Sequence, residues 1–328
     1  MRKKKHVLSL FLVLLSCTWL SGEMTIVEGK SRIPTGMVTH YAGDPKTVYD
    51  WFVLLPKNID PSKKYLILIT GPNGDLQTEK YSETIGVYSG VFERKIWKYG
   101  DLDYILLCPI IPRTHEFWPI YFPAKAYKDY PRYYAAPDLK VLRILEALQD
   151  MLAEQGIKTY PKVFIEGFSA GAIFATRMAF LHPEMVYAIA AGAGGCLNLP
   201  LSEYKGTQLP YPLGASDYCT LFGKPFDFAS YKSVCQYLYI GVWDFIQSNS
   251  ILYDTKAIYN QDQLAFLRSC FGDRDPVFLR NQASLLADLG CNIRFKFYKT
   301  NHNGDFPEME DDIRAFFREM ESKIRATE

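Results

Sequence analysis

Residues 162–172 read KVFIEGFSAGA, and this stretch decides the fold. The apolar run over 163–165 predicts a strand, and the small residues that follow Ser169 open a predicted helix. Gly167 and Gly171 flank Ser169, where a sharp strand-to-helix turn leaves no room for side chains. Short glycine–serine matches also arise by chance, so the flanking strand and helix carry the interpretation. Together they predict that Ser169 is a nucleophile held at the edge of a sheet.

Strand and helix patterns alternate along the rest of the chain. Short apolar runs bounded by turn residues predict strands over 48–55, 65–69, 104–111, 163–165, 187–191, 237–240 and 293–298. Apolar residues at helical spacing and helix start and stop signals predict helices over 79–99, 138–155, 170–181, 276–289 and 309–323. This alternation favours an α/β fold with a mostly parallel central sheet and helices on both faces.

Composition excludes several classes of protein. The chain has 328 residues, 48% hydrophobic and 22% charged, which is close to the averages of globular proteins and argues against disorder or collagen-like repeats. Lys plus Arg number 37 and Asp plus Glu 36, so the net charge of +1 gives no support for a nucleic-acid partner. The length permits one large domain.

The first 22 residues have the layout of a signal peptide. A basic start at Arg2–Lys5 precedes an apolar stretch at Val7–Leu15, which is shorter than the roughly 20 residues that span a membrane. Leu14–Cys17 resembles the bacterial lipobox, in which the cysteine is lipidated and attaches the protein to a membrane. Cleavage after Gly22 would instead release a soluble protein. We therefore expect a secreted or cell-envelope protein, with a lipid on Cys17 as one alternative.

The predicted division of the remaining chain into segments rests on composition alone. We expect an N-terminal segment over 23–47 and one catalytic domain over 48–328, with a Pro- and Tyr-rich loop or small cap at 197–235. Six cysteines follow Cys17, which permits disulfides without fixing a pairing. Cys108 lies in an apolar run and is interpreted as a buried free thiol. The sequence has no CxxC motif and gives no support for a metal site.

A serine nucleophile needs a base, and the chain has five histidines. His302 follows the last predicted strand, which is where the base lies in folds with the chain order serine, acid, histidine. His182 ends the helix that follows Ser169 and suits a structural role at a helix terminus. His115 is interpreted as a loop residue or a substrate contact.

The acid that orients the histidine should lie between Ser169 and His302, at the end of a strand. Asp244 follows the predicted strand over 237–240 and a glycine turn, and it is the preferred candidate. Asp275 is the runner-up, with helix capping as its structural alternative. The remaining candidates are Asp254, Asp262 and Asp273.

Two backbone amides should stabilise the oxyanion of the reaction. One is the amide of Ala170, directly after the nucleophile, and the other lies in the loop 70–75, which reads TGPNGD. Pro72 has no N–H and cannot donate, so Asn73 or Gly74 is the expected second donor. An ordinary Gly/Asn/Pro turn is the alternative interpretation of this loop.

These motifs resemble the α/β-hydrolase superfamily, and in particular its secreted esterase branch of polyhydroxybutyrate depolymerase-like and feruloyl esterase-like proteins. The matching segments are 105–109 (ILLCP), 167–171 (GFSAG), 181–184 (LHPE), 239–241 (YIG) with Asp244, and 301–303 (NHN). The resemblance implies a Ser169, Asp244 and His302 triad, no cofactor, and hydrolysis of carboxylic esters through an acyl-enzyme. Where such enzymes usually carry His-Gly at the oxyanion loop, this chain has Thr70-Gly71.

The substrate is the least determined feature. Aromatic residues crowd the segment 115–134 and flank the proposed acid, and we single out Trp118, Tyr121, Trp243 and Phe245 as substrate-binding candidates. They would suit an ester with an aromatic, sugar or polymer moiety, while packing in the core is the alternative. A serine esterase is the main hypothesis. A serine peptidase of the same fold and a non-catalytic envelope binding protein are the rivals.

Overall fold

The computed structural model describes residues 26–71, 78–245, 258–273 and 275–327. Within these ranges the strands of the main sheet are β1 Ile26–Glu28, β2 Val38–Tyr41, β3 Trp51–Leu54, β5 Ile67–Thr70, β6 Ile105–Pro109, β8 Val163–Phe168, β9 Val186–Gly192, β12 Cys235–Gly241 and β13 Ile293–Tyr298. They are ordered β1-β2-β3-β6-β5-β8-β9-β12-β13. Strands β2–β3 and β3–β6 pair antiparallel, and every other neighbouring pair is parallel. The prediction of a mostly parallel sheet is confirmed.

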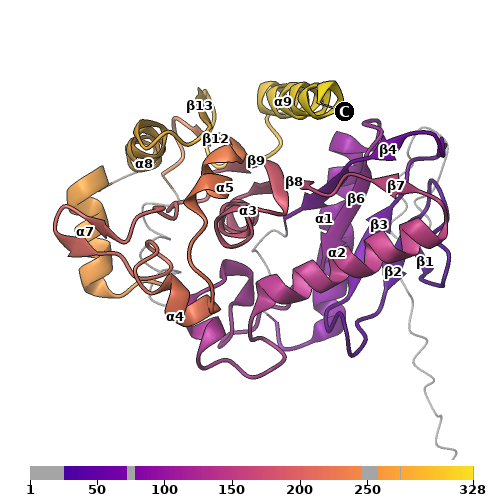
Figure 1. Cartoon of the computed structure of the whole chain (residues 1–328), viewed down its shortest axis with the longest axis horizontal. Coiled ribbons are helices and arrows are strands. Elements are labelled where there is room, and N and C mark those ends of the chain that lie inside the picture. The colour runs from indigo at the N-terminus through magenta and orange to yellow at the C-terminus, as the bar shows by residue number, and fades with distance from the viewer. Residues whose placement is uncertain (1–25, 72–77, 246–257, 274, 328) are drawn as a thin grey trace, which may run out of the picture.

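Helices cover both faces of this sheet, as predicted. The long helices are α1 Tyr81–Tyr99, α2 Pro137–Glu154, α3 Ala170–Leu181, α8 Val277–Asp288 and α9 Pro307–Ala326. Helices α1 and α9 share one face, where Phe317 stacks on Phe164 of β8 at 5.1 Å and meets the edge of Tyr99 at 6.4 Å between ring centroids. Figure 1 shows α9 on one side of the central strands and α3 on the other. Both faces of the central strands are buried, which explains their continuous apolar sequences.

Smaller elements surround this core. Two short strand pairs are β4 Lys64–Tyr65 with β7 Lys158–Thr159, and β10 Glu203–Tyr204 with β11 Thr207–Gln208. The short helices are η1 Pro119–Tyr121, η2 Ala124–Tyr127, α4 Tyr218–Phe222, α5 Phe228–Ser233 and α7 Gln261–Phe271. Before β12 begins, segment 197–235 thus contains two short helices and one hairpin with strands of two residues each, which fits its strand-poor sequence.

The structure differs from the sequence-based predictions in three places. Strands β1 and β2 come from the segment 23–47 that we had set apart, so the sheet begins before residue 48. A strand of three or four residues has too little alternation to be seen in sequence. The single strand predicted over 65–69 is divided between β4 and β5, which belong to different sheets. Helix α7 was not predicted, although Asn260 and Gln263 form a capping box at its start.

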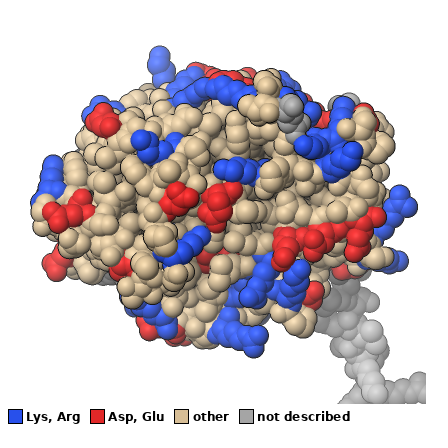
Figure 2. Space-filling view, in the orientation of Figure 1, with Lys and Arg blue, Asp and Glu red and all other residues tan. Residues whose placement is uncertain are grey.

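Several sequence predictions concern residues outside the described ranges. They are the signal peptide with Cys17, the oxyanion candidates Asn73 and Gly74, and the alternative acid Asp254. The cysteines from Cys108 onward are all described and are free thiols, and Cys108 is buried as expected. No helix in the described part of the chain is long and apolar enough to cross a membrane. Figure 2 shows positive and negative side chains interspersed over the face it presents.

Candidate active site

Ser169 occupies a strained turn between β8 and α3. Its backbone angles are φ 56° and ψ −120°, in the region of positive φ that residues other than glycine rarely adopt. Such a conformation costs on the order of 1–3 kcal/mol and persists only where the surrounding structure fixes it. Part of that fixation is a hydrogen bond from the Ser169 amide to the Gly192 carbonyl of β9, at 2.8 Å.

The glycines around this turn are required by close backbone approach. A Cβ on Gly167 would overlap the carbonyl of Gly171 in the first turn of α3. A Cβ on Gly71, after β5, would lie 2.8 Å from the same oxygen. The Gly71 amide donates to the Glu166 carbonyl at 2.6 Å. That amide is therefore already bonded within the fold and is not available to an oxyanion.

Asp244 and His302, the predicted acid and base, are in direct contact at the same edge of the sheet. His302 Nδ1 and Asp244 Oδ2 are 2.7 Å apart, with the Asp244 side chain fully buried and that of His302 16% exposed. Gly241, which ends β12, allows this approach, because a Cβ there would lie 2.5 Å from the Asn301 carbonyl. The Trp243 amide also donates to the Thr300 carbonyl at 3.0 Å. The loops after β12 and β13 are therefore fixed against each other.

The loop that carries His302 extends back to β8, the strand that ends before Ser169. Strand β13 lies three positions from β8 in the sheet, yet the His302 ring lies 4.8 Å from the ring of Phe168, centroid to centroid. A Cβ on Gly304 would lie 3.0 Å from the same Phe168 ring. Phe168 directly precedes Ser169, so the structure places the predicted base against the residue before the predicted nucleophile.

Comparison with known proteins identifies the fold. No family model matches the chain, and no curated protein matches it in sequence. The solved structures that are similar include poly(aspartic acid) hydrolase-1 from Sphingomonas sp. KT-1, with a TM-score of 0.55, 16% identity, and coverage of 86% of this chain and 97% of that one. They also include the poly(3-hydroxybutyrate) depolymerase LpqC from Bordetella parapertussis, with a TM-score of 0.52, 16% identity, and coverage of 84% and 86%.

The chain has the α/β-hydrolase fold. In an α/β-hydrolase the nucleophile, acid and histidine follow one another along the chain, each after a strand of the central sheet. Ser169 after β8, Asp244 after β12 and His302 after β13 have this order. The fold prediction made from the strand-to-helix turn is therefore confirmed.

The other part of an α/β-hydrolase site is the oxyanion hole. Ala170 is the first residue of α3, so its amide lies at the positive end of the helix. Asn73 and Gly74 belong to the segment 72–77, outside the described residues. Of the expected donors, the structure thus places Ala170 alone.

Asp275, the runner-up acid, lies near the pair without replacing Asp244. Its side chain is buried, and neither carboxyl oxygen has a hydrogen-bond partner within the described residues. Burial and the negative charge of Asp244 raise the pKa of Asp275 to about 7, while the nearby His302 lowers it. The other described candidates, Asp262 and Asp273, are exposed. Asp244 is the carboxylate that holds His302.

The four aromatic candidates divide into two environments. Trp118 is partly buried against the guanidinium of Arg113, 4.3 Å from its ring centroid. Tyr121 is only 3% exposed and belongs to η1, which packs against α3. Trp243 and Phe245, on either side of Asp244, are 58% and 53% exposed. Burial of Tyr121 agrees with the packing alternative, whereas Trp243 and Phe245 remain accessible to a ligand.

The remaining histidines have other partners. His182 Nε2 lies 2.8 Å from Asp138, at the start of α2, and His40 Nε2 lies 2.8 Å from Asp50. The backbone amide of His115 donates to Glu79. Among the described residues, no three His, Cys, Asp or Glu side chains gather in an arrangement that could hold a metal ion.

Three charged residues beside the site were missed in the sequence. Lys95 and Lys98 of α1 and Glu166 of β8 form ion pairs there. The paired residues lie at least 71 positions apart along the chain, so no local sequence pattern predicts these contacts.

Proposed function

We propose that this protein is a serine hydrolase that cleaves carboxylic esters, with Ser169 as nucleophile, His302 as general base and Asp244 as the acid that orients His302. The observation that carries the proposal is the meeting of two features at one edge of the sheet. Ser169 is held in a strained turn, and the Asp244–His302 pair lies against Phe168, the residue before it.

The proposed reaction has two halves. Asp244 accepts from Nδ1 of His302, which fixes the tautomer in which Nε2 is free to take a proton. Nε2 removes the proton from Ser169 Oγ as the oxygen attacks the ester carbonyl, and the imidazolium then protonates the departing alcohol. Water attacks the acyl-enzyme in the second half, with the same proton transfers, and releases the acid. The Ala170 amide and a second amide, from Asn73 or Gly74, would stabilise the oxyanion.

The ester rather than the amide bond is the preferred substrate class. The names of the two structural neighbours refer to a polyester and to poly(aspartic acid), a polyamide, and both fit the fold. The exposed rings of Trp243 and Phe245 beside Asp244 would suit an aromatic, sugar or polymer moiety next to the scissile bond. A paired series of aryl esters and matching anilides tests the choice. A peptidase should hydrolyse the anilides as well as the esters, whereas an esterase should hydrolyse the esters alone.

The decisive experiment combines covalent labelling with turnover. A fluorophosphonate probe should label Ser169 alone, as mapped by peptide mass spectrometry, and Ser169→Ala should lose at least about 10³-fold in kcat on aryl esters. Ser202→Ala, an exposed serine on the same domain, is the matched control and should keep full activity. Labelling elsewhere, or turnover that survives in Ser169→Ala, would contradict the proposal. A folded protein that neither reacts nor turns over esters would favour the binding-protein alternative.

We further propose that the protein is exported through its first 22 residues, on the sequence pattern alone. Mass spectrometry of the mature N-terminus separates the two alternatives. A diacylated Cys17 supports a lipid-anchored protein, and an unmodified start near Glu23 supports a secreted one.

A further inference from the structure

Helix α1 carries two lysines that hold the nucleophile strand and the histidine loop. The first is Lys95, whose Nζ lies 2.6 Å from Oε2 of Glu166, with side chains 6% and 3% exposed. Glu166 is in β8, three residues before Ser169, and its carbonyl also accepts the Gly71 amide. Lys95 thus fixes α1 to the strand that ends in the nucleophile.

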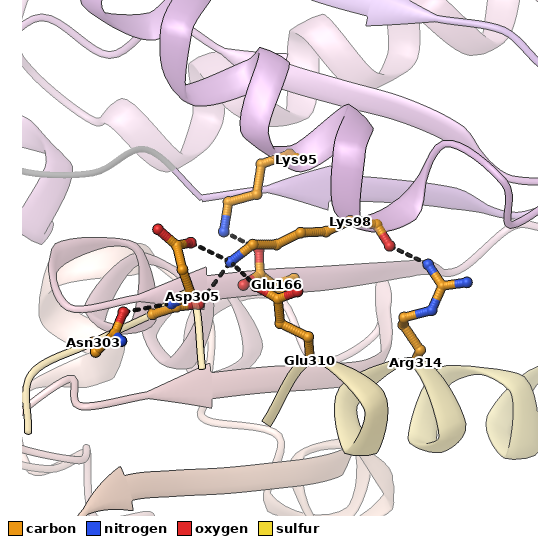
Figure 3. A network of polar contacts seen from close by, with 8 residues as sticks. Lys95, Lys98, Glu166, Asn303, Asp305, Glu310 and Arg314 are labelled. Atoms are coloured by element: carbon orange, nitrogen blue, oxygen red, sulfur yellow. Dashed lines mark hydrogen bonds and ion pairs between the residues drawn. The ribbon is translucent and has the colours of Figure 1, made fainter. Parts of the chain in front are cut away.

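The second lysine, Lys98, reaches the loop that carries His302. Its Nζ donates to the Gly304 carbonyl at 2.6 Å and to Asp305 Oδ1 at 2.6 Å, and it pairs with Glu310 of α9 at 2.9 Å. Figure 3 shows this side chain extending between α1, the loop and the start of α9. Three acceptors satisfy the three N–H groups of an ammonium. Gly304 is two residues from His302.

Lys98 remains charged in this environment. Burial alone would lower the pKa of Lys98, but the hydrogen bond to Asp305 and the charges of Glu166 and Glu310 outweigh burial and raise that pKa. Asp305 responds in the opposite direction. Although burial would raise the pKa of Asp305, its hydrogen bond to Lys98 lowers it. The contact is therefore a full ion pair at neutral pH.

The helix that carries both lysines is itself fixed. Arg314 of α9 donates to the Lys98 carbonyl (Figure 3). Arg314 also pairs with Asp101, just beyond α1. Tyr99 is fully buried and makes an edge contact with Phe317 of α9. Since residues three apart lie on the same side of a helix, Lys95 and Lys98 face the same way. Any displacement of the loop relative to β8 must stretch one of their contacts.

We propose that Lys98 is a positioning residue for His302, and that Lys95 and Lys98 together fix the distance between the base loop and the nucleophile strand. The inference rests on the proposed function. The Lys95–Glu166 pair is buried and the Lys98–Asp305 pair is partly exposed. Neither kind of ion pair adds much net stability, because desolvation offsets the attraction in the first and solvent screens it in the second, so their main effect here is on geometry. Misplacing a catalytic group by about 1 Å can cost on the order of 10²-fold in rate.

The test compares Lys98→Met with Lys98→Arg, since methionine keeps most of the length and arginine keeps the charge. In the full chain, Lys98→Met should lower kcat on an aryl acetate about 10-fold or more while KM changes less than about twofold. The rate of fluorophosphonate labelling at Ser169 should fall in parallel, and Lys98→Arg should recover most of both. Lys323→Met, which removes an exposed lysine paired with Glu319 on α9, is the matched control and should change neither.

The outcomes are separable from those of the proposed function. Ser169→Ala that retains turnover overturns the proposed function itself, whatever Lys98 does. Ser169→Ala without activity, beside a folded Lys98→Met with unchanged kcat and labelling rate, overturns only the positioning role. A kcat loss that persists in Lys98→Arg also overturns the positioning role. So does a kcat loss in Lys98→Met that only matches the fraction of unfolded protein. Should Lys98→Met fail to fold, Asp305→Asn at a side chain 64% exposed takes its place and should lower kcat about threefold or more; an unchanged kcat there also overturns the role.

Discussion

The described residues include two carboxylate–histidine pairs whose carboxylates are almost completely buried and whose geometries are nearly equal. His302 meets Asp244 at 2.7 Å, and His182 meets Asp138 at 2.8 Å. Both carboxylates are at most 2% exposed. By distance and burial alone, neither pair could be selected as the catalytic one.

The two pairs differ in what the second ring nitrogen can reach. His182 has Asp138 at Nε2 and Glu184 at Nδ1, 3.5 Å away, and its side chain is 6% exposed. It joins the start of α2 to the end of α3 and has both nitrogens occupied. His302 is held at Nδ1 by Asp244, and it lies on a loop beside a strained serine. A histidine needs one anchored and one available nitrogen to transfer protons, so the comparison supports the proposed catalytic role of His302 and favours a structural role for His182.

The largest expected effect comes from breaking the pair on the catalytic side. Asp244→Asn removes the charge that stabilises the imidazolium and favours the wrong tautomer of His302, so kcat should fall about 10³- to 10⁴-fold. Steady-state hydrolysis of an aryl ester measures this. The equivalent change in the other pair, Asp138→Asn, should leave kcat of the folded protein within about twofold. Equal losses in the two variants would erase the distinction between the pairs.

The same substitution on the structural side should act on stability instead. Asp138→Asn leaves His182 buried without its ionic partner, which should lower the free energy of unfolding by about 3 kcal/mol. Urea denaturation at pH 6 measures it. Burial alone would lower the pKa of His182, but hydrogen bonds to Asp138 and Glu184 outweigh it and raise that pKa above 6.5.

The raised pKa gives this stability loss a direction with pH. A protonated His182 stabilises the folded state fully below pH 6.5, and the contribution disappears as pH rises through its higher folded-state pKa. The penalty of Asp138→Asn should therefore be larger at pH 6 than at pH 9. A penalty that is constant with pH would mean that His182 is neutral in the pair.

Asp275 extends the comparison to a buried carboxyl that has no histidine of its own. Burial and the charge of Asp244 raise its pKa to about 7, so ionising it in the folded state is unfavourable. Unlike a salt-bridged acid, it destabilises the folded state increasingly as pH rises from its unfolded value of 3.8 to about 7. The free energy of unfolding of Asp275→Asn, relative to that of the parent, should therefore rise by about 2 kcal/mol between pH 5 and pH 8.

Urea denaturation at the two pH values checks this difference. Asp273→Asn, an exposed neighbour, serves as the control and should show no such trend. A flat difference for Asp275→Asn would show that this carboxyl is already ionised at pH 5.

The parts of the fold visible in the sequence are those with local signals. Helix α3 and strand β13 have the predicted bounds, because small-residue periodicity and β-branched or aromatic runs fix them. Strands β1 and β2 were missed because backbone pairing with the neighbouring strand defines them. The capping box at Asn260 was a local signal for α7 that could have been used.

The residues of the candidate site also fall into two groups, those with a signal in the sequence and those without one. Ser169, Asp244 and His302 could be selected because chain order and strand ends constrain them. The difference between His182 and His302 became visible only once their partners were in place. Lys98 offered no signal, since lysines three apart usually lie on a solvated helix face. Its role depends on contacts with Gly304 and Asp305, more than 200 positions away.

The smallest expected effect sharpens the comparison by measuring the strain at Ser169, which is located on the catalytic side. Ser169→Ala and Ser169→Gly both remove the hydroxyl, but only glycine adopts φ 56° without a steric penalty. Glycine also gains more freedom in the unfolded chain, which offsets part of the relief. Ser169→Gly should therefore be more stable than Ser169→Ala by about 1 kcal/mol in urea denaturation. At exposed Ser202, where no positive φ is present, the same pair of substitutions should rank the other way. If alanine were the more stable replacement at Ser169 as well, the turn would hold no strain to release, and its geometry would be no evidence for a nucleophile.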